Sequence, residues 1–140
     1  MSKVILGIDF GDARTGLAVV GKSGSIAVGA GMIKCESFKK TVTEAAEAAK
    51  REKAELIVVG NPINMNGTEG PRSEKCRAFA AELEAESGIP VKLYDERLTT
   101  VQAHSFLSEM GVNHKKRKNT VDELSATLIL QDYYDRYGDK

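Results

Sequence analysis

The chain has 140 residues, with 20 Lys plus Arg and 20 Asp plus Glu, so its formal net charge is zero. This length suits a single domain, 1–140, that buries roughly two-thirds of its unfolded surface. The charge balance excludes a simple basic coat protein, although a neutral chain can still cluster its positive charge on nucleic acid.

The sequence also lacks the pattern of a membrane-spanning segment and a metal-binding or redox cysteine motif. No stretch approaches the ~20 apolar residues of a membrane span, and no basic run precedes an apolar block at the N-terminus. The two cysteines, Cys35 and Cys76, are far apart and have no metal-binding spacing. They are typical of reduced thiols in a reducing compartment, so we expect a cytoplasmic protein.

The first part of the chain predicts three antiparallel strands. Residues 4–9 form an apolar run that ends at Asp9, which indicates a strand buried on both faces and near the centre of the sheet. Residues 14–20 and 26–34 predict two further strands, and a tight turn at 21–24 joins them.

The rest of the chain alternates helices and strands. A strand that is reached through a helix is expected to lie parallel to its neighbour. The fold class is therefore α/β, with a five-stranded mixed sheet of three antiparallel strands and then two parallel ones, and with helices on both faces. The predicted elements are a helix at 37–53 capped by Ser37, a strand at 54–60, a polar loop at 61–70, a helix at 72–87 after Pro71, a strand at 91–94, a helix at 99–110, a basic connector at 113–119, and a helix at 120–137 opened by a Thr120–Glu123 capping box.

Four carboxylates lie at the ends of these elements: Asp9, Asp95, Glu96 and Asp122. Sites in open α/β sheets gather outside the carboxyl ends of parallel strands. Asp9 could instead begin a turn, and Asp122, expected in the first helical turn, could simply complement the helix dipole. Converging carboxylates without Cys or His suit Mg²⁺ or Mn²⁺, and two such ions about 3.5–4 Å apart hydrolyse phosphodiesters.

Two glycines flank the first of these acids. Gly7 and Gly11 carry no side chain on either side of Asp9, so another backbone or a ligand could approach closely. We expect them to leave clearance for metal and phosphate.

A basic run concentrates four positive charges just before Asp122, at Lys115, Lys116, Arg117 and Lys118. Such a run can be a solvated loop, but its position beside an acidic site favours contact with a phosphate backbone. Further candidates for binding nucleic acid are Arg14, Asn64, Arg72 and Arg97, and Asn61 is a polar loop residue that could bond substrate or form a turn.

Four segments resemble the YqgF family, also called RuvX, which comprises pre-16S rRNA nucleases and Holliday junction resolvase-like proteins. They are GIDFGDARTG at 7–16, VVGNPINMNGTEGPR at 58–72, YDERLTT at 94–100 and KKRKNTVDELSA at 115–126. The resemblance spans essentially the whole chain. It implies an RNase H-like fold and a nuclease that depends on Mg²⁺ or Mn²⁺, with two ions.

The resemblance also implies the ligand set. One acid comes from the first strand, one from the end of the fifth and one from the last helix, which gives Asp9, Glu96 and Asp122. Alternation puts Asp95 and Glu96 on opposite faces of the strand, and we choose Glu96 for its longer reach and the family's Asp-Glu-Arg pattern.

Several functions stay open at this stage. The resemblance implies processing of the 5′ end of pre-16S rRNA, and the alternative is resolution of branched DNA by a symmetric homodimer. The residues do not separate RNA from DNA or a monomer from a homodimer. An actin-like ATP-binding module is a remote alternative, because Asp9-Phe10-Gly11 followed by Gly16 resembles a phosphate loop, and so is a non-catalytic nucleic-acid-binding relative.

Overall fold

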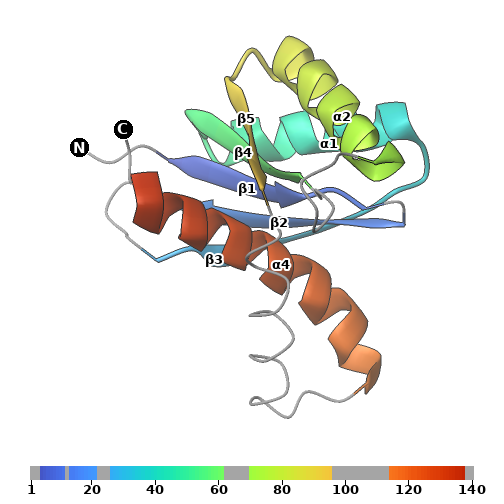
Figure 1. Cartoon of the computed structure of the whole chain (residues 1–140), viewed down its shortest axis with the longest axis vertical. Helices are drawn as coiled ribbons and strands as arrows, with labels where there is room; N and C mark the ends of the chain where they lie inside the picture. Colours follow the sequence, from blue (N-terminus) through green and yellow to red (C-terminus); the bar gives the residue numbers. More distant parts are fainter. Residues whose placement is uncertain (1–3, 12, 22–25, 62–69, 96–113, 138–140) are drawn as a thin grey trace.

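Five strands form one mixed sheet in the order β3-β2-β1-β4-β5 (Figure 1). The computed structural model describes residues 4–11, 13–21, 26–61, 70–95 and 114–137, and for residues 95 and 114–123 it describes the backbone alone. β1 pairs antiparallel with β2 and parallel with β4. β3 is antiparallel to β2, and β5 is parallel to β4. The predicted sheet, with the first strand central, is confirmed. The strands are β1 (Ile5–Asp9), β2 (Arg14–Val20), β3 (Val28–Lys34), β4 (Leu56–Asn61) and β5 (Val91–Asp95).

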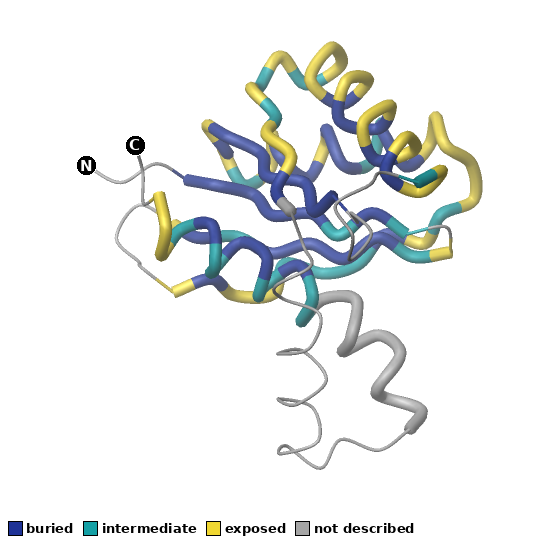
Figure 2. Tube along the Cα trace, in the orientation of Figure 1, coloured by how far each residue is buried: buried dark blue, intermediate teal, exposed yellow. Residues whose placement is uncertain are grey.

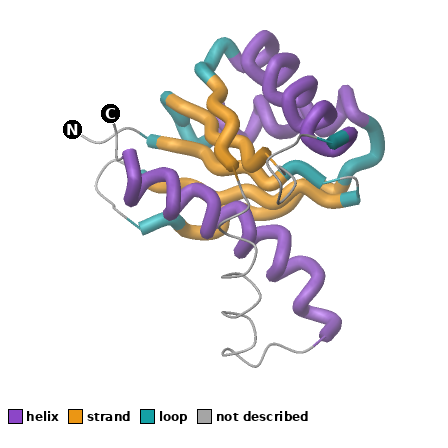
Figure 3. The backbone as a smooth tube through the Cα atoms, in the orientation of Figure 1, coloured by secondary structure: helices purple, strands orange, loops and turns teal. Residues whose placement is uncertain are grey.

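Helices cover both faces of this sheet, as predicted. Helices α1 (Phe38–Arg51) and α2 (Pro71–Ser87) pack against each other on one face, and α4 (His114–Tyr137) crosses the other (Figure 1). Figure 3 shows the resulting order of helix, sheet and helix. No helix in the described part of the chain combines the length and apolar character of a membrane span.

Alternation along β1 divides the core into two parts. Leu6 and Ile8 join the core under α1 and α2, whereas Ile5 joins the core under α4. All three side chains are fully buried. Figure 2 shows the central strands of the sheet coloured as buried. Successive strand residues point to opposite faces, so a strand covered on both faces needs an unbroken apolar run.

The ends of α1 and α2 follow from their capping residues. The side chain of Ser37 accepts a hydrogen bond from the backbone N–H of Lys40 and so satisfies one of the free donors of α1. Pro71 occupies the first turn of α2, where its missing N–H costs nothing. Gly88 ends that helix with φ of 71°, in the left-handed region that glycine adopts without strain.

The predicted boundaries at the start of β3 and the start of α4 are wrong. β3 begins at Val28, and Ile26, expected in the strand, is 72% exposed. α4 begins at His114, so the expected basic connector at 113–119 belongs largely to the helix. Lys and Arg are good helix formers, and neither Gly nor Pro interrupts residues 114–137. The predicted helix at 99–110, and residues 22–24 of the predicted turn, lie outside the described residues.

Candidate active site

Asp9 is the last residue of β1 and lies at the carboxyl end of the central strand. It pairs with Gly16 of β2 in the antiparallel ladder, so it belongs to the strand rather than to the following turn. Because Ile5 and Gly7 face α4, alternation puts Asp9 on the same face. Asp9 is half-buried, which leaves it partly shielded and still reachable from solvent.

Gly7 has a different role from the one expected. A Cβ atom on Gly7 would lie 2.7 Å from Cβ of Leu130 and 3.2 Å from the carbonyl oxygen of Ala126. The space beside this glycine is therefore filled by α4, and the expected clearance for metal and phosphate is wrong at this position. The absent side chain lets α4 approach β1 closely.

Two arginines predicted to contact phosphate lie at the same end of β1. Arg14 begins β2, and alternation puts it on the α4 face, which it shares with Ala18 and Val20. Arg72, in the first turn of α2, donates from Nη2 to the carbonyl oxygen of Phe10 at 3.2 Å. The structure thus puts a guanidinium group on each of two elements, β2 and α2, that meet the chain at the C-terminal end of β1.

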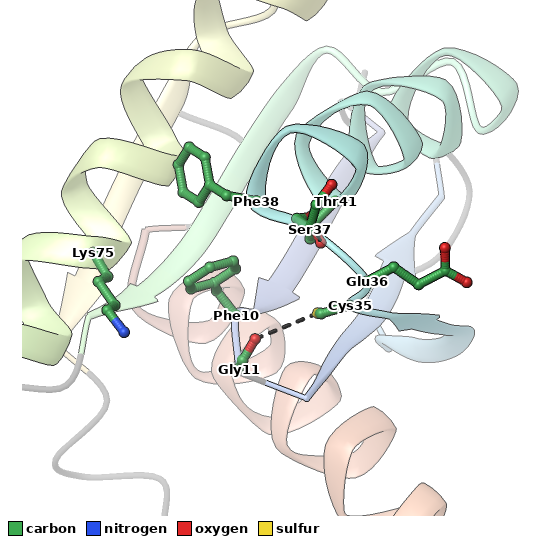
Figure 4. A pocket seen from close by; sticks show the side chains of 8 residues that line it. All are labelled: Phe10, Gly11, Cys35, Glu36, Ser37, Phe38, Thr41 and Lys75. Carbon is green, nitrogen blue, oxygen red and sulfur yellow. Dashed lines mark hydrogen bonds between the residues drawn. The ribbon is translucent and has the colours of Figure 1, made fainter.

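Three polar groups hold the turn that follows Asp9. The N–H of Gly11 donates to Oγ1 of Thr15 at 3.4 Å, and that oxygen lies 3.1 Å from Sγ of Cys35. The Cys35 thiol also donates to the carbonyl oxygen of Gly11 at 3.4 Å (Figure 4). A Cβ atom on Gly11 would lie 2.3 Å from the carbonyl oxygen of Arg14, so backbone rather than a ligand occupies this space too. Cys35 is not in a disulfide, as predicted.

A cavity of about 240 Å³ opens beside this turn (Figure 4). Its lining includes Phe10, Cys35 and Phe38, and Lys75 reaches it from α2. The ring of Phe10 stacks on Phe79 of the core under α1 and α2, with 4.4 Å between the ring centroids. Phe10 and Asp9 therefore point to opposite faces, and this cavity lies away from the carboxylate of Asp9.

The other predicted ligands are not placed by the structure. Glu96, Arg97 and Asn64 lie outside the described residues. Asp122 and the basic run at 115–118 belong to α4 by their backbone, and Asp122 lies in the third turn rather than the expected first. Among the side chains that the structure describes, no three of His, Cys, Asp and Glu lie close enough to hold one metal ion.

Asn61 has a structural role. It is the last residue of β4 and is buried, whereas the sequence predicts a loop there. Its Oδ1 accepts a hydrogen bond from Oγ of Ser73 at 2.6 Å. This amide therefore joins the end of β4 to the first turn of α2.

Sequence reasoning missed a tyrosine cluster on the α4 face. Tyr94 of β5 packs edge-on against Tyr133 and Tyr137 of α4, with ring centroids 6.0 Å and 6.5 Å away. The hydroxyl of Tyr94 donates to Asp132, and burial together with this hydrogen bond raises the pKa of Tyr94 well above its ordinary value. The spacing of Tyr133 and Tyr137, one helical turn apart, is the signal that could have indicated the cluster.

Solved structures with this arrangement define the fold class. RuvC from T. thermophilus, in complex with a Holliday junction substrate, has a TM-score of 0.59 and 21% identity, covering 99% of this chain and 98% of that chain. The sheet order and this likeness confirm the predicted RNase H-like fold.

Sequence comparison identifies the family. The family model described as "RuvX: Holliday junction resolvase" matches residues 3–136, and the chain belongs to this family. A protein of Ruminiclostridium cellulolyticum named "Putative pre-16S rRNA nuclease" is 45% identical over 94% of both chains. A protein of the same name from Caldanaerobacter subterraneus is 44% identical, over 94% of this chain and 95% of its own. The predicted family is confirmed.

Proposed function

We propose that the chain is a divalent-metal-dependent nuclease that processes the 5′ end of pre-16S rRNA in the cytoplasm. The observation that carries the proposal is the position of Asp9, a half-buried carboxylate at the carboxyl end of the central strand in a RuvX-family chain. The substrate is inferred from the names of relatives that are 44–45% identical over nearly the whole chain.

Asp122 is the second proposed ligand, and the packing of α4 on β1 supports it. Ala126 and Leu130 of α4 lie against Gly7, and Asp122 stands one helical turn before Ala126. Asp9 stands two residues after Gly7, and the C-terminal end of α4 lies near the start of β1 (Figure 1). The direction along α4 from this contact to Asp122 is therefore the same as the direction along β1 from Gly7 to Asp9.

Glu96 is the third proposed ligand. Tyr94 of β5 joins the core on the α4 face, and residues two apart in a strand share a face. This alternation supports Glu96 rather than Asp95 as the acid that accompanies Asp9.

These three oxygen donors fit Mg²⁺ or Mn²⁺, which prefer carboxylates to thiolates or imidazoles. When bound, such ions supply Lewis-acid activation of the phosphodiester and of the attacking water. The chain itself contributes a rigid mount for Asp9, through the pairing of β1 on both sides, and cations for the substrate backbone. We assign that second role to Arg14, Arg72 and the run at 115–118.

The test compares Asp9→Asn with wild type on precursor 16S rRNA, in Mg²⁺ and in Mn²⁺. We expect cleavage to fall at least about 100-fold, more than the loss of an outer partner of a metal ligand causes. Asp135→Asn, an identical change at an exposed position of α4, is the matched control and should cleave at the wild-type rate. Wild-type cleavage by Asp9→Asn would contradict the proposed site.

Resolution of branched DNA is the second candidate. The description of the family model and the likeness to RuvC on its Holliday junction favour it. Such an enzyme would act as a homodimer, since it cuts two strands related by a two-fold axis, whereas trimming of an RNA end is compatible with a monomer. A four-way DNA junction assayed beside precursor 16S rRNA, with the oligomeric state measured by sedimentation, separates the two functions.

A further inference from the structure

We propose that the cavity between β5 and the C-terminal end of α4 binds an unpaired nucleotide of the substrate strand, some nucleotides away from the phosphodiester that is cut at Asp9. This inference rests on the proposed nuclease function and adds a subsite to it. The cavity has a volume of about 410 Å³ and is lined by Lys92, Leu93, Tyr94, Tyr133, Arg136 and Tyr137.

The aromatic part of this cavity is firmly held and partly open. Tyr94 and Tyr133 are buried, at 8% and 4% exposure, and their rings meet at nearly a right angle of 87°. Tyr137 is 50% exposed and lies 5.0 Å from Tyr133 between ring centroids. Two fixed rings thus support a third ring that has surface available for stacking with a base. Base stacking on such rings is tolerant of sequence, because every base has a π-face.

The charge of the lining favours nucleic acid over an apolar protein segment. Lys92 and Arg136 add two cations to the tyrosines, and Arg136 also lies 3.3 Å from a carboxylate oxygen of Asp132. Cations beside stacked aromatic rings are the combination by which proteins bind single strands, where the cations follow the phosphates and the rings hold the bases.

The register of the sheet places one wall of this cavity, at Tyr94, level with Asp9. Val59 of β4 pairs with Ile8 on one side and with Leu93 on the other, so Asp9 and Tyr94 are each one residue further along. Their strands are separated by β4 alone, and strand spacing puts the two backbones roughly 10 Å apart. Both residues lie on the α4 face. The exposed ring of Tyr137 lies further off, because the C-terminal end of α4 lies near the start of β1 (Figure 1). A single strand whose phosphate lies at Asp9 therefore reaches the tyrosines with a nucleotide some positions along the strand.

The composition of the chain supplies a direct probe. It has four tyrosines and no tryptophan. Three of the tyrosines form this cluster, and the fourth, Tyr134, packs against the same core. The intrinsic fluorescence of the protein therefore comes from this region alone. We expect a short single-stranded oligoadenylate RNA to quench this emission when it is added to the Asp9→Asn protein, where cleavage does not complicate the measurement.

The decisive variant is Tyr137→Ala, combined with Asp9→Asn. We expect affinity for the oligoadenylate to fall roughly tenfold, which is within the range of one lost base–aromatic stack. Tyr137→Phe keeps the ring and should bind like the parent protein. An oligonucleotide of abasic residues should bind both proteins equally, because it has no base to stack.

A second variant tests the charge. Lys92→Gln should reduce the slope of log K against log salt by roughly 0.7, the change expected when a single-strand phosphate contact is lost. Lys39→Gln, on α1 and the opposite face, is the control and should leave the slope unchanged.

Three results would overturn the inference. They are binding without quenching, equal affinity of Tyr137→Ala and Tyr137→Phe, and a change in oligomeric state on Tyr137→Ala with unaltered binding. The last would show that the cluster contacts a second protein. A failure of the nuclease proposal is recognised separately, by cleavage that persists in Asp9→Asn.

Discussion

The two faces of the sheet differ in what they bury and in what they leave at the end of β1. The face under α1 and α2 carries the larger apolar core, which includes the stacked rings of Phe10 and Phe79. The face under α4 carries a smaller core, and it also carries Asp9, Arg14 and the tyrosine cluster. The difference indicates that the face under α1 and α2 supplies more of the buried apolar core, whereas the face under α4 carries Asp9, the proposed ligand.

The largest expected effect on stability comes from the face under α1 and α2. Leu83 of α2 is fully buried, and Leu83→Ala should lower the free energy of unfolding by about 2–5 kcal/mol through lost burial and a cavity. Chemical denaturation measures this change. Leu83→Met, which nearly conserves volume, should cost less than about 1.5 kcal/mol. The cleavage rate per folded molecule should stay at the wild-type value in both variants. A lower rate would contradict the assignment of different roles to the two faces of the sheet.

The next effect concerns the α4 face. Gly7→Ala should cost about 1–3 kcal/mol by overpacking, since its Cβ would lie 2.7 Å from Cβ of Leu130. Unlike Leu83→Ala, it should also slow cleavage, because α4 must move away from the strand that carries Asp9. Gly21→Ala is the matched control, as no described atom lies within 4 Å of its added Cβ. Equal rates in the two glycine variants would contradict the role assigned to Gly7.

A smaller, pH-dependent effect is expected at Tyr94. Tyr94→Phe removes the hydroxyl that donates to Asp132 and should cost about 1 kcal/mol near neutral pH. Because the pKa of Tyr94 is raised in the folded protein, its contribution to stability is fully present below the unfolded pKa of about 10 and is lost as pH rises further. Urea unfolding across this range should show a shallower alkaline loss in Tyr94→Phe than in wild type. Parallel curves would contradict this assignment.

The smallest effect is at the start of α1. Ser37→Ala removes the side-chain acceptor for the N–H of Lys40 and should cost about 0.5–1 kcal/mol. Ser37→Asp should retain the cap and nearly all the stability. Neither variant should alter cleavage, since α1 lies on the face opposite to Asp9. Thermal unfolding and the cleavage assay together check both statements.

The sequence predicts the strands well because their apolar patterns match their burial. β1 is buried on both faces and reads as an unbroken apolar run, and β2 has the predicted bounds. The start of α4 is harder to predict, because Thr120 and Glu123 match a capping box that here lies inside a longer helix. Local patterns alone do not tell whether a helix continues past a favourable first turn.

Of the candidate site, too, only a part could be predicted from the sequence. The pattern of β1 predicts a carboxylate at a strand end, and the pairing of Asp9 confirms that position. The role of Gly7 could not be predicted, because its neighbours Ala126 and Leu130 are more than a hundred residues away in the sequence. The tyrosine cluster is missed for the same reason, since Tyr94 meets Tyr133 only through the packing of α4 on the sheet.

The buried hydrogen bond between Asn61 and Ser73 has a consequence for local unfolding. It fixes the end of β4 to the start of α2 independently of the residues between them. Opening either element at this point requires the bond to break, and proteins open locally in cooperative units. The end of β4 and the first turn of α2 are therefore expected to open together, which hydrogen exchange of their backbone amides would detect.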